Sequence, residues 1–357
     1  MPRDDEEPWR LPETRRGTDT LLAPGHRPSL SPETKARLAR IVRRAPEVMV
    51  KITGRSRGIV HLKSHLDYLT RNGRLEAETQ DGQQVPNRAA LRELHDDWLM
   101  ANALMERDRG VRVGPEKAQS VGIILSMPAG APPDRVQDAA RVWARETFGD
   151  RHDWLMVRHD DRDHPHVHVT VRAVGSDGRR LVAGPADLQA WRERFAAELR
   201  RLGVEAEATP RHARGLVAKA ERTVVREVRL RGLEPRAVRE ERRKAAGDAA
   251  GPQHEPQGWE RAIQARQASI RTAYLTHAEI LDAGNEDDRR LAADVRAFIA
   301  DMPVPLNRRQ VLAAELRRNR DTAASALLRP VEPEAPIREQ SKQPTAFLKP
   351  QPPQRRR

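Results

Sequence analysis

The chain has 357 residues, 33% of them charged and 3% aromatic, and a formal net charge of +13; this length suffices for two domains, and the basic excess favours a polyanionic partner. Charge alone does not separate DNA, RNA and anionic membranes, but no apolar run reaches the roughly 20 residues of a membrane span and the first residues lack a signal-peptide core, so we expect a cytoplasmic protein. Because the sequence has no cysteine, disulfides and thiolate zinc sites are excluded, and any metal ion must be held by His, Asp or Glu.

The first part of the chain alternates between strand and helix patterns. Residues 1–30 are rich in proline and charge without apolar periodicity, and we expect a disordered tail there. Ser31-Pro32-Glu33 is a helix start signal, and Asp81-Gly82 predicts the turn of a hairpin. The elements expected next are a strand over Val48–Thr53, a tight basic loop over Gly54–Gly58, a helix over Val60–Asn72, hairpin strands over Leu75–Thr79 and Gln83–Val85, and a helix over Arg88–Arg107.

Strand patterns stop after Gly215, and helical patterns follow. The expected elements are a strand over Val121–Met127, a helix over Asp134–Phe148, strands over Trp154–His159 and His164–Val174, and helices over Asp187–Leu202, Leu216–Arg231, Trp259–Asp282, Asp287–Asp301 and Arg308–Leu328. We therefore expect an α+β domain over residues 31–216 with a largely antiparallel, helix-covered sheet. An α-helical accessory region over 217–328 and a disordered, Pro/Arg-rich tail over 329–357 follow it.

The stretch RHDDRDHPHVHVTV concentrates histidines at strand spacing. Residues two apart in a strand point to the same side, so His164, His166 and His168 share a face. His159 ends the preceding strand and can be brought alongside by an antiparallel return. Three converging imidazoles would make a metal site with open positions, and Asp161 or Asp163 could accept the outward N–H of a ligating ring. The alternative is a solvated polar strand without a metal; the imidazoles would also suit zinc or another transition metal.

Only two tyrosines occur in the sequence, and they differ in their surroundings. Tyr68 lies in HLKSHLDYLTRNG, with His61 and His65 on the same predicted helix face and several arginines nearby. A phenol is a poor nucleophile near neutral pH because its ordinary pKa is about 10, so nearby cations, a metal-activated phosphate and a base would be needed. The alternative is a half-buried structural residue. Tyr274 follows an apolar helical stripe with Ile270 and is interpreted as a packing residue.

Together these segments resemble a known family. HDDRDHPHVHV is similar to the third motif of the conjugative relaxases of the P-type mobilisation class, which are HUH (histidine–hydrophobe–histidine) endonucleases and include the border-nicking relaxases of Ti plasmids. VGIILSMPAG with ARVWARETFG resembles the strand, turn and helix that precede that motif. KITGRSRG with HLDYLTRNGRLE looks like the first motif of a proteobacterial subgroup, and DLQAWRERFAAELRRLGVEAEATPRHARG is similar to its continuation. The resemblance covers about residues 47–216.

The resemblance implies a five-stranded antiparallel sheet flanked by helices and a divalent cation, Mg²⁺ or Mn²⁺. It implies that His159, His166 and His168 are the metal ligands and that Tyr68 is the nucleophile. It also implies nicking of one strand at an origin of transfer, with a 5′-phosphotyrosyl adduct as the product. Asp161, or a histidine outside the metal site, is the candidate base. The expected DNA contacts are Arg55, Arg57, Arg71 and Ser126, the last as the serine of the second motif.

One departure and two alternatives remain open. Many relatives have Asn shortly after the last histidine, where this chain has Arg172. A rolling-circle replication initiator or transposase of the HUH class would share the histidine motif, and a non-catalytic basic DNA-binding protein would need only the charge. The Pro-His-Val-His context argues against the first alternative.

The resemblance also implies partners. They are single-stranded or supercoiled plasmid DNA at an origin of transfer, accessory relaxosome proteins, and the coupling protein of a type IV secretion channel. The protein would then act in the bacterial cytoplasm and be translocated with its DNA into the recipient cell. The basic tail from Pro330 is a candidate signal for the coupling protein, and the alternative is that it only adds solubility or DNA affinity.

Overall fold

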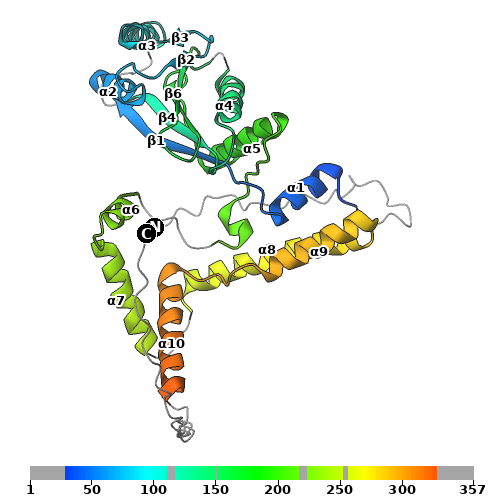
Figure 1. The fold of residues 1–357 in the computed structure, drawn as a ribbon. Helices are drawn as coiled ribbons and strands as arrows, with labels where there is room; N and C mark the ends of the chain where they lie inside the picture. Colours follow the sequence, from blue (N-terminus) through cyan, green and yellow to red (C-terminus); the bar gives the residue numbers. More distant parts are fainter. Residues whose placement is uncertain (1–28, 111–116, 150, 217–222, 252–255, 328–357) are drawn as a thin grey trace, which may run out of the picture. The chain divides into compact units, whose positions relative to one another are not determined.

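A computed structural model describes residues 29–110, 117–149, 151–216, 223–251 and 256–327 (Figure 1). The predicted tails fall largely on residues 1–28 and 328–357, which lie outside the described ranges. The elements are α1 (Pro32–Val42), β1 (Met49–Arg57), α2 (Ile59–Leu69), β2 (Ala77–Thr79), β3 (Gln84–Val85), α3 (Arg88–Arg109), β4 (Ala118–Ser126), α4 (Pro133–Phe148), β5 (Trp154–His159), β6 (His166–Arg172), α5 (Pro185–Arg201), α6 (Thr223–Leu230), α7 (Arg236–Ala250), α8 (Gly258–Asp282), α9 (Glu286–Ala300) and α10 (Arg308–Leu327).

The strands form one sheet in the order β1-β4-β6-β5-β2-β3, and every neighbouring pair is antiparallel. The predicted α+β class with a largely antiparallel sheet is confirmed. The described sheet has six strands where the resemblance implied five, because the short β2–β3 hairpin extends it beyond β5. Gly82 has φ +75°, a left-handed conformation that glycine adopts without steric cost, and it makes the predicted turn.

Helices cover both faces of the sheet (Figure 1). On one face, α4 and α5 bury a core that includes Trp143 and Ile123. On the other, α2 and α3 bury a second core that includes Leu66 and Val157. Residues of β5 are therefore buried on both sides, which explains why its sequence is almost continuously apolar. The histidines of β5 and β6 lie on the α2 side of the sheet, where His159 contacts the carbonyl of Leu69 at the end of α2.

The predicted basic loop over Gly54–Gly58 is wrong. β1 continues to Arg57, and Arg55 pairs with Val121 of β4. An irregularity between Ile52 and Gly54 absorbs one residue and lets the strand go on. Pairing with β4 thus overrides the local turn tendency of the glycines, as tertiary context commonly does for strands.

The helix α1 begins where the sequence predicts, with the hydroxyl of Ser31 accepting the N–H of Thr34 at 3.2 Å. Together with α8 and α9 it forms a separate core around Tyr274 and Phe298 (Figure 1). Helices from both ends of the chain therefore share one core. The domain boundary expected at residue 216 stays a prediction; by contacts, the described residues up to 216 and those over 256–307 form one compact unit.

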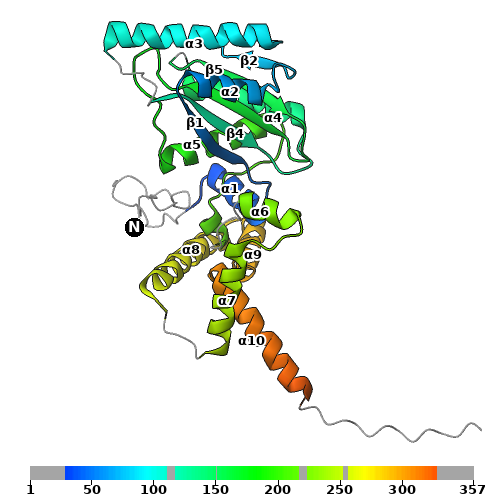
Figure 2. The ribbon, with the colours of Figure 1, turned by 90° about the vertical axis from the view of Figure 1, so that its left-hand side faces the viewer.

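A second unit holds the described residues over 223–251 and 308–327. In it α7 and α10 lie side by side (Figure 2), and Arg309 donates to the carboxylate of Asp248 at 2.6 Å. The helix α7 had not been predicted, because few of its residues are apolar and those that it buries are mainly alanines. None of the described helices is long and apolar enough to cross a membrane.

Candidate active site

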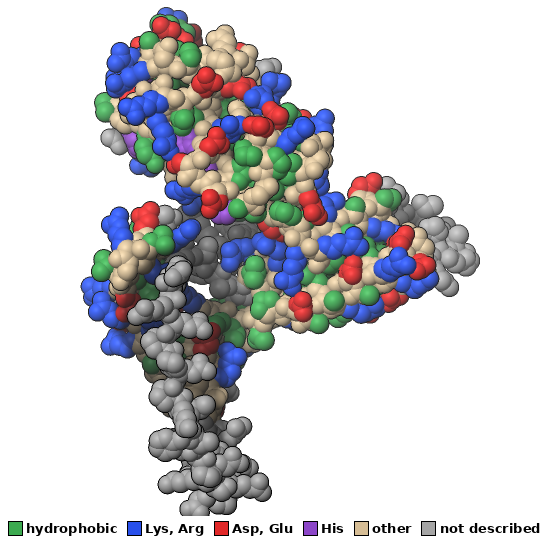
Figure 3. Space-filling model, in the orientation of Figure 1, with side chains coloured by type: hydrophobic (Ala, Val, Ile, Leu, Met, Phe, Trp, Pro, Cys, Tyr) green, Lys and Arg blue, Asp and Glu red, His purple; other side chains and the backbone are tan. Residues whose placement is uncertain are grey.

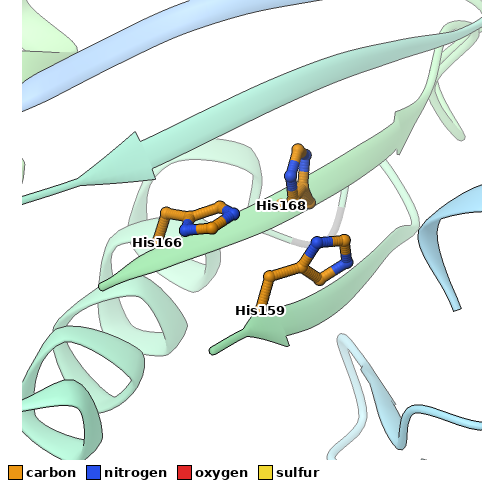
Figure 4. Close-up of side chains that lie close together, drawn as sticks. All are labelled: His159, His166 and His168. Atoms are coloured by element: carbon orange, nitrogen blue, oxygen red, sulfur yellow. The ribbon is translucent and has the colours of Figure 1, made fainter. Parts of the chain in front are cut away.

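Three histidine rings converge where β5 ends and β6 begins (Figure 4). His159 pairs with His166 in the strand register, and His168 follows two residues later on the same face of β6. Each ring offers one nitrogen, and these nitrogens all lie within 4.8 Å of one another. The predicted convergence of these three rings is thus present in the structure. His164, which shares the strand spacing, is exposed and lies outside the cluster.

Backbone carbonyls orient two of the rings. Nε2 of His159 donates to the carbonyl of Leu69 at 2.7 Å, and Nδ1 of His166 donates to the carbonyl of His164 at 3.0 Å. A carbonyl can only accept, so these nitrogens carry the hydrogens and the other nitrogen of each ring has a free lone pair. The expectation that Asp161 or Asp163 would accept these N–H groups is therefore wrong for both rings.

The environment favours the neutral forms of two of these rings. Burial lowers the pKa of His159, and burial together with the charges of the neighbouring histidines lowers the pKa of His168 to about 3. Neutral imidazoles with inward lone pairs are the donors that a divalent metal ion needs. The residues therefore fit a metal ion, with three protein nitrogens and room for further ligands on the cleft side.

Tyr68 projects into solvent from the last turn of α2. The helix buries Leu62, Leu66 and Leu69 against the sheet, whereas the side chain of Tyr68 is 75% exposed. The alternative of a half-buried packing residue is thus wrong. Tyr274, by contrast, is fully buried, and its hydroxyl donates to the carbonyl of Ala213 at 3.2 Å, which confirms its interpretation as a packing residue.

His65, one turn before Tyr68 on α2, is partly buried and contacts the sheet. Its Nε2 lies 3.2 Å from the hydroxyl of Thr170 on β6. Gly122 of β4 makes room for the ring: a β-carbon there would lie 3.2 Å from His65 Nε2 and 2.8 Å from the hydroxyl of Thr53. The glycine thus lets α2 pack close to the sheet, and this contact sets the distance between the sheet and the helix that carries Tyr68.

Tyr68 and the histidines line one cleft of about 550 Å³. Its other lining residues come from the end of α2, the turn after it, β4 and the β5–β6 loop. The full lining is Asp67, Tyr68, Arg71, Asn72, Arg74, Ile124, His159, Asp161, Arg162, His166 and His168. Asn72, Arg74 and Arg162 were not predicted as site residues from the sequence. The Asn-Gly pair after the helix was a usable signal, because it favours a left-handed turn that changes the direction of the chain.

Asp161 and Arg71 form an ion pair in this cleft. Nη2 of Arg71 donates to Oδ2 of Asp161 at 2.6 Å, and Oδ1 of Asp161 lies 3.7 Å from Nε2 of His166. Burial acts to raise the pKa of Asp161, but the Arg71 guanidinium and the neighbouring histidines outweigh it and hold the pKa below its usual value. The carboxylate is therefore ionised in the free protein.

The remaining candidate residues lie outside the cleft lining. Ser126 ends β4 opposite His166 and is buried, and its hydroxyl donates to the carbonyl of Met127 at 3.3 Å. Arg55 and Arg57 are exposed near the other end of β1, and their partners in the register, Val121 and Ala118, belong to the face under α4 and α5. In Figure 3 lysine and arginine side chains gather around α2. Lys63 on α2 is exposed, and so are Arg71 and Arg74 in the turn after it.

Comparison with known proteins bears on this geometry. Residues 68–203, which carry Tyr68, Asp161 and the three histidines, match the family model described as the MobA/VirD2-like relaxase nuclease domain. The chain therefore carries a VirD2-like relaxase domain.

Curated relatives agree with this assignment. The T-DNA border endonuclease VirD2 of Rhizobium radiobacter is 28% identical over 191 residues, which cover 48% of this chain and 44% of the relative. The protein of the same name from Agrobacterium fabrum (strain C58) is 31% identical over 138 residues, 35% of this chain and 30% of the relative. The chain thus matches less than half the length of these relatives.

Within the relaxase domain, Arg172 has a structural environment. It is buried at the end of β6 away from the histidine cluster, where its Nε donates to Asp153 at 2.5 Å and its Nη1 to Asn102 of α3 at 3.2 Å. The arginine thus ties α3 to the sheet. The position at which many relatives carry Asn is therefore used here for packing and charge pairing.

Proposed function

We propose that the protein is a DNA relaxase that nicks one strand at a plasmid or integrative-element origin of transfer and remains attached to the 5′ phosphate. One observation carries the proposal: an exposed tyrosine and three converging imidazoles line a single cleft in a relaxase domain. A tyrosine used only for packing would be buried, as Tyr274 is. A non-catalytic DNA-binding protein would not need this constellation.

Three histidines are proposed as the metal ligands. His159, His166 and His168 would hold a divalent cation, Mg²⁺ or Mn²⁺, which when bound supplies Lewis-acid polarisation of a phosphate oxygen. Nitrogen donors favour a transition ion, and hard Mg²⁺ prefers oxygen ligands, so we expect Mn²⁺ to bind more tightly. The carbonyls of Leu69 and His164 keep the ligand nitrogens of two rings aimed inward.

Tyr68 is proposed as the nucleophile. Its phenolic oxygen attacks the phosphorus, the bond from phosphorus to the 3′ oxygen breaks, and a 5′-phosphotyrosyl link and a free 3′ hydroxyl result. The leaving oxygen takes up one proton while the phenol gives one up, so protons balance. The energy of the broken phosphodiester is retained in the new one, and the strand can be rejoined.

Asp161 is proposed as the acceptor of the phenolic proton. In the free protein the guanidinium of Arg71 pairs with the carboxylate of Asp161 and offsets its negative charge. A DNA phosphate entering the cleft competes for Arg71, because guanidinium binds phosphate through two parallel hydrogen bonds. Asp161 would then lose its counter-charge as the substrate arrives and become the better base at that moment. The other carboxylate in the lining, Asp67, lies 3.7 Å from Arg88 outside the cleft.

DNA contacts are proposed in two places. Arg71 acts at the scissile phosphate, and Ser126, beside His166 at the end of β4, contacts the strand near the nick. Arg55 and Arg57 are exposed on the edge strand β1 and would bind phosphates farther along the DNA. Since few aromatic side chains are present for stacking, we expect most of the affinity to be electrostatic and to fall steeply with salt.

The wider role is proposed by analogy with the relaxase family. The protein would act in the bacterial cytoplasm with accessory relaxosome proteins, and a type IV coupling protein would pass it with its DNA into the recipient. We assign recognition by these partners to the helical region over 217–328 and to the tail from 329. Truncation after Leu328 should then leave nicking in vitro intact and sharply reduce mating transfer; loss of both, or of neither, would refute this assignment.

A direct experiment tests the nicking activity. The full chain is incubated with supercoiled plasmid carrying the transfer region of its own element, or with a library of single-stranded oligonucleotides, in the presence of Mn²⁺. We expect a protein–DNA adduct that survives SDS and that excess EDTA prevents. Binding without any adduct would favour a non-catalytic DNA-binding protein instead.

A further inference from the structure

The turn that follows Tyr68 has an unusual backbone. Arg71, Asn72 and Gly73 have φ angles of +51°, +61° and +76°, so three consecutive residues are left-handed. Among the described residues, Arg44 is the only other non-glycine with a positive φ. Side chains disfavour this conformation, and such outliers persist where the surrounding structure enforces them, often at functional sites.

Neighbouring groups enforce this turn. The N–H of Asn72 donates to the carbonyl of Asp67 at 2.7 Å, and the N–H of Gly73 donates to the hydroxyl of Thr70 at 3.1 Å. A β-carbon on Gly73 would lie 2.4 Å from the backbone nitrogen of Arg88, so the turn presses directly on the start of α3. The backbone is thus pinned from both sides, and its amides are already used.

The turn, however, also borders the cleft. Arg71, Asn72 and Arg74 all line it together with Tyr68. Arg71 pairs with Asp161, whereas Asn72 and Arg74 are exposed, and no described residue supplies either side chain with a hydrogen bond or an ion pair. Asn tolerates left-handed backbone largely because its amide bonds to the local chain. Here that amide is left for a ligand.

We propose that Asn72 reads the base of a nucleotide beside the scissile phosphate, while Arg71 and Arg74 hold the phosphates flanking that nucleotide. The inference rests on the proposed function and adds the residue that sets sequence preference next to the nick. Guanidinium groups serve phosphates, which only accept hydrogen bonds. A neutral amide both donates and accepts, and it matches adenine, whose N6 donates and whose N7 accepts. The order Arg71, Asn72, Arg74 therefore places a base reader between two phosphate binders.

The test uses single-stranded oligonucleotides with randomised positions around the nick. Covalent adducts are recovered under denaturing conditions and their DNA is sequenced. We expect the wild-type protein to enrich adenine at one position beside the nick. Asn72→Gly accepts the left-handed backbone without strain and removes the amide; we expect the preference at that position alone to fall by about 5- to 100-fold, the range for one bidentate base contact. Asn72→Asp, which can only accept, should shift the preference towards cytosine, whose N4 donates.

Two further variants serve as controls. Arg44→Gly relieves a φ of +59° away from the cleft and should leave every base preference unchanged. Arg74→Ala should reduce adduct formation on all sequences alike and lower the salt dependence by about one counterion. Thermal unfolding of each variant establishes that it is folded at the assay temperature.

Three results would overturn the inference. If Asn72→Gly and Asn72→Asp keep the wild-type preference at every position, Asn72 reads no base. If Asn72→Gly, while folded, loses adduct on all sequences equally, the turn only positions Tyr68. If the wild-type protein itself forms no adduct with any sequence, the proposed function fails, and this inference fails with it.

Discussion

The imidazole of His159 donates its Nε2–H to the carbonyl of Leu69 at 2.7 Å, and Leu69 directly follows Tyr68 in the chain. The helix that carries the proposed nucleophile is therefore hydrogen-bonded to a proposed metal ligand. A movement of α2 would disturb the ring of His159, and a rotation of that ring would disturb the end of α2. The tyrosine and the histidine cluster are thus positioned as one unit.

Metal binding should depend on the three clustered histidines and not on their neighbour in the motif. Loss of an outer hydrogen bond to a ligand commonly costs about 10- to 100-fold in metal affinity, and loss of the ligand itself should cost at least as much. We therefore expect His168→Ala to lower the affinity for Mn²⁺, measured by titration calorimetry, by tenfold or more. His164→Ala is the matched control, because it keeps the carbonyl that orients His166 and removes only an exposed ring. Equal losses in both variants would contradict the assignment of ligands.

Two glycines that pair with each other in the strand register provide a test of whether close packing of α2 on the sheet positions Tyr68. Gly122→Ala would place a methyl group 2.8 Å from the hydroxyl of Thr53 and 3.2 Å from His65, so the Thr53 hydroxyl would have to move and His65 of α2 would have to give way by a few tenths of an ångström. Misplacement by about 1 Å can cost 100-fold in rate, so we expect nicking to slow by about 10- to 100-fold with DNA affinity retained. Gly54→Ala meets no atom within 4 Å and should nick normally. An unchanged rate of nicking in Gly122→Ala would show that the packing of α2 at Gly122 does not position Tyr68.

The ion pair between Arg71 and Asp161 should separate binding from catalysis. Asp161→Asn removes the proposed base and frees Arg71, so the rate of nicking should fall by about 10²- to 10⁴-fold while DNA affinity stays the same or rises. Arg71→Ala should instead weaken DNA binding. Rates and fluorescence-anisotropy affinities are measured across pH 6–9. Wild-type rates in Asp161→Asn over that whole range would exclude Asp161 as the base.

The shared core of α1, α8 and α9 predicts that the relaxase domain is not stable when cut at residue 216. Removal of α8 and α9 would expose Leu38 and Ile41, which are almost fully buried, and each such side chain contributes roughly 1.5–3 kcal/mol through burial. We expect the fragment 1–216 to melt at a clearly lower temperature than the full chain, or to aggregate. A fragment 45–216, which lacks α1 as well, should behave better than 1–216. Equal melting of the fragment 1–216 and the full chain would contradict the role of this core.

The histidine cluster could be predicted from the sequence because it depends on short-range rules. The spacing of His166 and His168 puts them on one face of a strand, and a short connection returns that strand beside His159. The acceptors of their outward N–H groups could not be predicted, since they are carbonyls, which every residue has. Asp161 was the obvious acceptor by type, yet it pairs with Arg71.

Longer-range features were the ones that sequence patterns missed. The stretch after Gly54 is a strand only because β4 lies beside it. The partner of α1 lies more than 200 residues away in the chain, so no local pattern points to it. The Asn-Gly pair favours a left-handed turn, but the left-handed backbone of Arg71 before it could not be predicted, because it depends on the contact between Gly73 and the start of α3.

The identity of the residue joined to DNA tests the central proposal most directly. The adduct formed with Mn²⁺ is digested with protease and nuclease, and the peptide that keeps a nucleotide is identified by mass spectrometry. We expect a peptide containing Tyr68, with the phosphate on its phenolic oxygen, and no adduct from Tyr68→Phe, while Tyr274→Phe still forms one. A nucleotide on Tyr274 or on any other side chain, or an undiminished adduct from Tyr68→Phe, would contradict the proposal.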